Sequence, residues 1–109
     1  MALRALSSDQ LIAIAEQFRA LAEPSRLRLV SALRGGEQSV TQLMDATGLG
    51  QANVSKHLRL LLQAGFVRRR KSGVMTYYRL ADTDVSRLCD LMCDRLAADA
   101  AVRRKVFVR

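Results

Sequence analysis

The chain has 109 residues, of which 50% are hydrophobic and 26% charged, and this predicts one globular domain over residues 1–109, since domains commonly hold about 100–150 residues. No apolar run approaches the ~20 residues that span a bilayer, and the N-terminus lacks the apolar core of a secretory signal, so we expect a cytoplasmic protein with no membrane partner. The 18 Lys and Arg residues exceed the 10 acidic ones and give a net charge of +8, which favours a polyanionic partner such as nucleic acid.

Two helices are predicted in the first third of the chain. Ser7 and Gln10 fit a capping box ahead of the first helix, and apolar residues recur at helical spacing as far as Leu21. Pro24 suits the first turn of the second helix, where its missing N–H has no cost, and Gly35-Gly36 ends that helix. The predicted buried face of the second helix consists of Leu27, Leu29, Val30 and Leu33.

The next two helices are predicted to be joined by a tight connection. Ser39 repeats the capping-box pattern ahead of a short helix that runs to about Thr47. Gly48-Leu49-Gly50 forms the connection, and a further helix runs from Gln51 to about Ala64. Two helices joined by a few residues that include Gly are typical of a helix-turn-helix.

A β-hairpin is predicted after these helices. The segments 66–71 and 74–80 carry β-branched or aromatic residues and flank Ser72-Gly73, which is a turn signal. Because four basic residues, 68–71, approach the turn, we expect a hairpin with a cationic tip. A helix-turn-helix followed by a basic hairpin is a winged helix.

A last helix is predicted from Asp82 or Asp84 through about Ala100. It has an apolar stripe that one small domain could bury against a second copy, made of Val85, Leu88, Leu91, Met92 and Leu96. Burial of the stripe within its own chain is the alternative, and the order of the basic tail over 102–109 stays open. The predicted fold class is mainly α, a dimeric winged helix-turn-helix with about five helices and a two-stranded wing.

The positive charge is concentrated in the middle of the chain, where residues 46–81 include seven Lys and Arg and no acidic residue. One face of the helix that starts at Gln51 is apolar, and the opposite face carries side chains able to bond base edges in the major groove. The alternatives are a solvated helix face and edge-strand protection by charge. The candidate DNA-binding residues are Gln51, Asn53, Ser55, Lys56 and Arg59 on this helix, and Arg69, Arg70 and Lys71 on the wing.

Three stretches resemble ArsR-type (arsenic-repressor) winged-helix regulators, and the resemblance covers about residues 10–100. The stretches are Leu21-Ala22-Glu23-Pro24-Ser25-Arg26-Leu27-Arg28-Leu29, Gln51-Ala52-Asn53-Val54-Ser55-Lys56-His57-Leu58-Arg59 with the following Leu62–Val67, and Arg70 through Tyr78-Arg79-Leu80. The resemblance implies a homodimer joined by the first and last helices. It also implies sequence-specific repression at a palindromic operator in double-stranded DNA, with an inducer that lowers DNA affinity.

Most sensor sites known in that family are absent from the matching positions. The arsenic-type cysteine box corresponds to residues 40–45, which contain no thiol. The zinc-type site on the last helix has Arg95 and Ala98 at two ligand positions, and the persulfide-type thiol pair corresponds to Ser31 and Ala97. We therefore predict no metal site of these kinds and no cofactor.

Cys89 and Cys93 are the remaining candidates for an effector site, because a spacing of four residues puts both thiols on one side of the last helix. They could bind a thiophilic metalloid or react with an oxidant that acts as inducer. The alternative is a regulator of the same fold that has structural cysteines and no effector. A non-specific basic nucleic-acid-binding module is a further alternative. An enzyme is not expected, since the single His, His57, is predicted to be partly buried on another helix.

Overall fold

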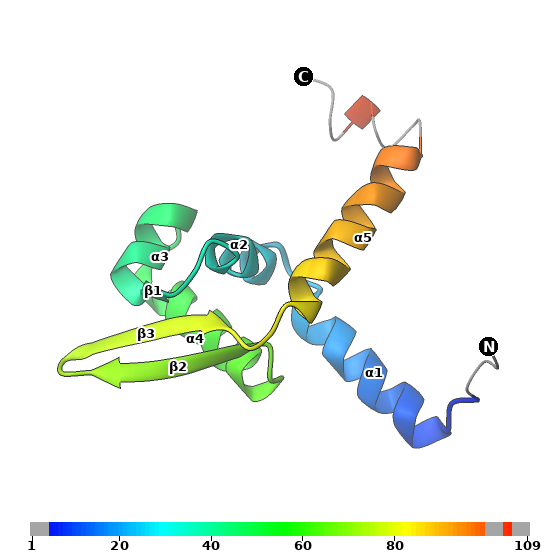
Figure 1. Ribbon diagram of the computed structural model, residues 1–109, viewed down its shortest axis with the longest axis horizontal. Coiled ribbons are helices and arrows are strands. Elements are labelled where there is room, and N and C mark those ends of the chain that lie inside the picture. The colour runs from blue at the N-terminus through cyan, green and yellow to red at the C-terminus, as the bar shows by residue number, and fades with distance from the viewer. Residues whose placement is uncertain (1–4, 100–103, 106–109) are drawn as a thin grey trace.

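The computed structural model describes residues 5–99 and 104–105. Most of the basic tail whose order the sequence left open therefore lies outside the described residues. Within the described part, five helices and three short strands follow one another along the chain (Figure 1). The elements are α1 (Ser8–Leu21), α2 (Pro24–Leu33), β1 (Gln38–Ser39), α3 (Val40–Thr47), α4 (Gln51–Gln63), β2 (Val67–Ser72), β3 (Met75–Leu80) and α5 (Asp84–Ala98).

Both predicted capping boxes are confirmed. The Ser7 hydroxyl accepts a hydrogen bond from the Gln10 backbone N–H at 3.1 Å, and the Gln10 side chain accepts one from the Ser7 N–H at 2.8 Å. Ser39 and Gln42 make the same pair of bonds ahead of α3, at 3.2 and 2.8 Å. Each box satisfies two backbone donors that have no partner inside the helix, which fixes where these helices begin.

The ends of α3 and α4 are set by left-handed glycines. Gly48 follows α3 with φ of 75°, and Gly65 follows the C-cap of α4 with φ of 84°. Glycine adopts this region without a Cβ clash, so it reverses the chain after a helix at little cost. The tight connection after α3 and the glycine stop after α4, both predicted from sequence, are therefore confirmed.

The sheet has three antiparallel strands in the order β1-β3-β2, whereas the sequence predicted only the two strands of the wing. The additional strand, β1, pairs Gln38 with Tyr78 and Ser39 with Tyr77. A two-residue strand has no periodicity that sequence analysis can detect. It ties the start of α3 to the base of the hairpin.

The tip of the hairpin differs from the expected cationic one. Ser72 pairs with Met75, so the turn itself consists of Gly73 and Val74. Gly73 has φ of 61°, as a glycine at the first central position of a type II′ turn does. Val74 is fully exposed, and the basic side chains lie further back along β2.

The core lies where α2, α3 and α4 meet. Its fully buried side chains are Leu29, Val30, Leu43, Val54, Leu58 and Leu61, and Val67 and Val85 close it from β2 and α5. The apolar face predicted for α4 consists of Val54, Leu58, Leu61 and Leu62, of which the first three are fully buried and Leu62 is partly buried. Leu27 was expected in the buried face of α2 but is 41% exposed, because it turns toward the opening between α1 and α5 instead of the core.

The helices α1 and α5 diverge from one end of this core, and the hairpin projects from the other (Figure 1). Both diverging helices carry exposed large apolar side chains, namely Leu11, Ile12, Ile14 and Phe18 on α1 and Leu91, Met92 and Leu96 on α5. Within the described residues, no helix combines the length and apolar character that crossing a membrane requires.

Candidate nucleic-acid interface

The exposed face of α4 carries all the helix residues that the sequence predicted for DNA contact. Val54, Leu58 and Leu61 are fully buried, and this fixes the rotation of the helix about its axis. The five side chains on its other face are all exposed: Gln51, Asn53, Ser55, Lys56 and Arg59. Amide, hydroxyl and cationic groups at the start of a helix are the groups that bond base edges when the helix enters a major groove.

The first turn of α4 can also receive an anion. Its N-cap is Gly50, which provides no side chain to bond the first backbone N–H groups. Open N–H groups and the positive end of the helix dipole together favour a phosphate oxygen at this position.

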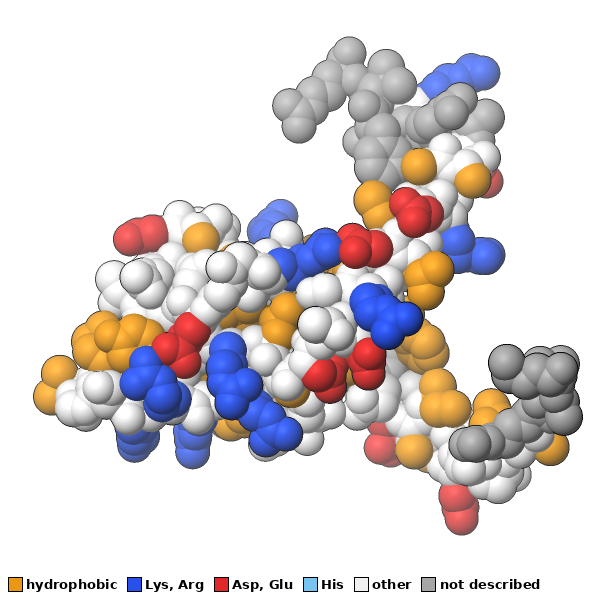
Figure 2. Space-filling model, viewed as in Figure 1, with side chains coloured by type: hydrophobic (Ala, Val, Ile, Leu, Met, Phe, Trp, Pro, Cys, Tyr) orange, Lys and Arg blue, Asp and Glu red, His pale blue; other side chains and the backbone are white. Residues whose placement is uncertain are grey.

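The wing presents its basic side chains on two faces, as strand alternation requires. Val67 is buried against the core, so Arg69 and Lys71 lie on that face of β2, beyond the edge of the core. Arg68 and Arg70 lie on the opposite face. All four are exposed, and Figure 2 shows Lys and Arg side chains gathered over the hairpin.

Arg70 has a partner within its own chain. Its guanidinium donates two hydrogen bonds to the Glu37 carboxylate, at 2.6 and 3.2 Å, and lies 4.7 Å from the centre of the Tyr77 ring. The hydrogen bond from Arg70 lowers the pKa of Glu37, and the same bond raises the pKa of Arg70. Arg70 therefore holds the wing to the segment before β1, and of the three predicted wing residues it is the one least available to DNA.

Arg68 and Arg79 are two further basic residues of the wing, which the sequence analysis did not include among the candidate DNA-binding residues. They are directly opposite each other on β2 and β3, and both are exposed. Like charges directly opposite each other destabilise a strand pair, and a phosphate between them would remove that repulsion. The sequence held the signal for this pair, because once Gly73 and Val74 are taken as the turn the register places Arg68 opposite Arg79.

A partly buried polar network joins the inner side of α4 to the junction of α1 and α2. His57 is 7% exposed, which confirms its predicted partial burial, and its Nδ1 lies 3.3 Å from Nη1 of Arg26. Arg26 also donates to the carbonyl of Ala20 at 2.6 Å, at the end of α1. Glu23 caps α2 through the Arg26 N–H. Burial raises the pKa of Glu23, but this hydrogen bond and the nearby His57 and Arg26 lower it overall.

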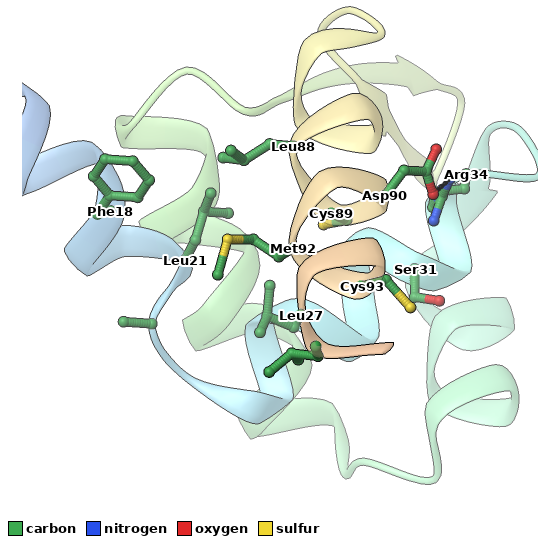
Figure 3. Close-up of a pocket in the computed structure, with 12 residues that line it drawn as sticks. Phe18, Leu21, Leu27, Ser31, Arg34, Leu88, Cys89, Asp90, Met92 and Cys93 are labelled. Carbon is green, nitrogen blue, oxygen red and sulfur yellow. Dashed lines mark hydrogen bonds and ion pairs between the residues drawn. The ribbon is translucent and has the colours of Figure 1, made fainter. Parts of the chain in front are cut away.

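The two thiols lie on α5 and line a groove of about 690 Å³ between α1, α2 and α5 (Figure 3). Cys89 is half-buried, Cys93 is exposed, and both are free thiols. Arg34, the C-cap of α2, donates a 2.7 Å hydrogen bond to Asp90 beside them. In the described part of the chain, no three His, Cys, Asp or Glu side chains are grouped so as to hold a metal ion.

A helix-turn-helix whose second helix exposes a polar face, flanked by a basic hairpin, defines a winged helix-turn-helix DNA-binding domain of the kind found in transcriptional regulators. Residues 23–69 match the family described as bacterial regulatory protein, arsR family. The chain belongs to this ArsR family of DNA-binding transcriptional repressors. The resemblance and the mainly α winged helix-turn-helix fold predicted from its sequence are both confirmed, while the predicted dimer stays a prediction.

Individual relatives agree with this assignment. A transcriptional repressor SmtB homolog from Synechocystis is 43% identical over 91 residues, which cover 84% of this chain and 69% of the relative. The HTH-type transcriptional regulator NmtR from Mycobacterium tuberculosis is 40% identical over 85 residues, 78% of this chain and 71% of the relative.

Among solved structures, the homodimeric winged helix-turn-helix DNA-binding domain Mb0332 from Mycobacterium bovis, a possible ArsR-family regulator, has a TM-score of 0.74. It is 31% identical, and the match covers 94% of this chain and 95% of that one.

Proposed function

We propose that this protein binds a palindromic operator in double-stranded DNA as a cytoplasmic homodimer and represses transcription there, with no catalytic activity. One observation carries the proposal: the wing projects from one end of the fold and α1 and α5 diverge from the other (Figure 1). The side chains exposed on α4 and the wing are polar or basic, whereas α1 and α5 expose large apolar side chains. Two copies joined through the apolar end would present two reading helices to DNA, and a symmetric pair of helices matches a symmetric operator.

In this proposal α4 enters the major groove. Gln51 and Asn53 suit adenine, Arg59 suits guanine, and Ser55 suits several base edges. Lys56 neutralises a phosphate or bonds a base. The wing residues Arg68, Arg69, Lys71 and Arg79 bind phosphates on either side of the groove, which positions the helix without specifying sequence. If the protein neutralises six or more phosphates, its affinity for DNA should fall by about 10³ or more when the salt concentration is raised from 50 to 200 mM.

The test is a binding titration with a duplex that the wild-type protein selects from a random pool. Lys56→Ala should weaken binding and reduce the salt slope by about one. Arg59→Ala should cost about 1–3 kcal/mol at the base pair it reads and relax specificity there. Arg87→Ala removes the same charge from an exposed position on α5 and serves as the matched control.

Unchanged affinity in both α4 variants would exclude α4 as the reading helix. Failure of the wild-type protein to select any consensus would favour the non-specific basic module.

We further propose that an inducer acts through Cys89 and Cys93, by binding as a thiophilic ion or metalloid or by oxidising the thiols. The support is their position in a groove next to the helices proposed to form the dimer. Cys89→Ser should abolish release from DNA by such agents. If that variant is released as readily as the parent, the cysteines are structural and the protein is an effector-independent regulator.

A further inference from the structure

Ala52 lies in the first turn of α4, on the face that points away from the core. Val54, Leu58 and Leu61 are fully buried and mark the inner side of this helix. Successive residues of an α-helix are rotated by about 100°, so Ala52 lies about 160° from Val54 and about 180° from Leu61 around the axis. Its methyl group is exposed and is directed almost exactly opposite the buried face.

The side chains around Ala52 are polar. In the first two turns of α4, residues 51–57, the other exposed side chains are Gln51, Asn53, Ser55 and Lys56. Ser55 and Lys56 follow Ala52 by three and four residues, the spacing that places helical side chains next to each other. Ala52 is thus the one apolar side chain exposed in these two turns, at the middle of a surface whose other groups form hydrogen bonds.

The major groove of DNA displays one apolar group, the C5 methyl of thymine. Ala is among the side chains that contact this methyl, whereas Gln and Asn bond the edge of adenine. A base pair that offers its adenine to Gln51 or Asn53 also presents its thymine methyl in the same groove. The three neighbouring residues of this turn therefore match the two bases of an A·T pair.

The short side chain of Ala52 requires a close approach of the helix. Its methyl reaches a base edge only where the backbone of the first turn comes near the floor of the groove, and the N-terminal residues of a reading helix are the ones that approach the bases. The N-cap, Gly50, adds no side chain that would keep this turn away from DNA.

We infer that Ala52 is a specificity-determining residue that selects thymine at one position of each half-site, through contact between its methyl group and the thymine methyl. The inference rests on the proposed function, in which α4 enters the major groove. Cytosine has an amino group and no methyl in that groove, so the contact distinguishes the two pyrimidines. Contact between two apolar groups involves no counterion release, so it is independent of salt, unlike the phosphate contacts of the wing.

The test replaces each thymine of the selected duplex in turn by uracil, which lacks only the C5 methyl. At one thymine of each half-site the wild type should lose about fourfold in affinity, the effect of one buried methyl group, both at 50 and at 200 mM salt. Ala52→Gly removes the methyl from the protein and leaves the core intact. It should bind the thymine and uracil duplexes at that position equally well.

The comparison of two duplexes within one variant removes any general effect of glycine on the helix, as in a double-mutant cycle. Ala98→Gly makes the same change at an exposed position of α5 and should keep the fourfold loss. The inference is overturned if the wild type and Ala52→Gly lose the same factor at every thymine, or if the selected half-site contains no thymine. Either result leaves the proposed function standing, whereas a wild type that selects no duplex would overturn both.

Discussion

Arg70 and Glu37 show how one contact changes the role of a basic residue. Arg70 belongs to a run of four cations, yet its guanidinium makes a two-point hydrogen bond with the carboxylate of Glu37. A planar fork matched to a carboxylate is the strong form of this interaction. On the same face of the hairpin, Arg68 and Arg79 have each other as direct cross-strand neighbours, so their charge is the more available to a phosphate.

Removing the Glu37 charge should strengthen DNA binding. Glu37→Gln releases the full charge of Arg70 to the wing, so we expect higher affinity for the selected duplex and a salt slope steeper by about one. The measurement is a titration at several salt concentrations. Lower affinity with an unchanged slope would mean that the pair is needed to hold the wing in position and that Arg70 does not reach the DNA.

The same pair predicts a pH dependence of stability. The pKa of Glu37 is lowered in the folded chain by Arg70, so the pair contributes stability above the unfolded pKa of a glutamate. That contribution is lost as the pH falls through the lowered, folded-state pKa. Urea unfolding of the wild type and Glu37→Gln should therefore differ at neutral pH and converge in acid. A difference that stays constant with pH would contradict this assignment.

At the scale of elements, the helix-turn-helix is set by local signals at each helix end. The capping box of Ser39 starts α3, and Gly48 reverses the chain after it. No neighbouring atom lies within 4 Å of a Cβ added at Gly48, so only its backbone conformation requires glycine. The glycine therefore determines how α4 leaves α3, and with it the orientation of the exposed polar face of α4.

Gly48→Ala should lower the free energy of unfolding by about 1–2 kcal/mol, the cost of a left-handed conformation for an L-residue. Gly35→Ala is the matched control, because Gly35 has open space for a Cβ and no positive φ. That variant should be neutral or stabilising by about 0.4–1 kcal/mol through the unfolded state. Thermal or urea unfolding measures both, and equal stabilities of the two variants would argue against a conformational role for Gly48.

At the scale of the whole molecule, the two ends of the fold have opposite chemistry. The basic end holds α4 and the wing, and the apolar end holds the exposed side chains of α1 and α5 (Figures 1 and 2). Arg26 and His57 link α1 to α4, because Arg26 donates to the Ala20 carbonyl in the last turn of α1 and its Nη1 lies 3.3 Å from His57 Nδ1 on the inner side of α4. Gln17 of α1 also donates to the carbonyl of Ala64 at the end of α4, at 2.9 Å.

Charging the apolar end should separate the proposed dimer. Leu91 is 60% exposed on α5, and Leu91→Glu would place a carboxylate in the buried contact between copies, which is costly without a partner. We expect a monomer by light scattering and much weaker DNA binding. Val74→Glu, which makes the same kind of change at the wing tip, is the control and should leave the mass of the dimer in light scattering unchanged. A wild-type monomer at micromolar concentration would contradict the dimer.

The helices, their caps, the family and the charged middle segment were all available from the sequence. These features arise between residues a few positions apart, as in the Ser7–Gln10 and Ser39–Gln42 boxes, where one short stretch contains both partners. Helical periodicity likewise showed which face of α4 is buried before any fold was known.

Only the tertiary structure decided which basic side chains are paired, that a third strand joins the wing, and that both thiols line one groove. Arg70 and Glu37 are 33 residues apart, and Arg34 and Asp90 are 56 apart. Contacts over such separations form only once the core has set the positions of the elements. Charge and periodicity along the chain could therefore predict which surfaces exist, while packing decided which of their groups were already paired.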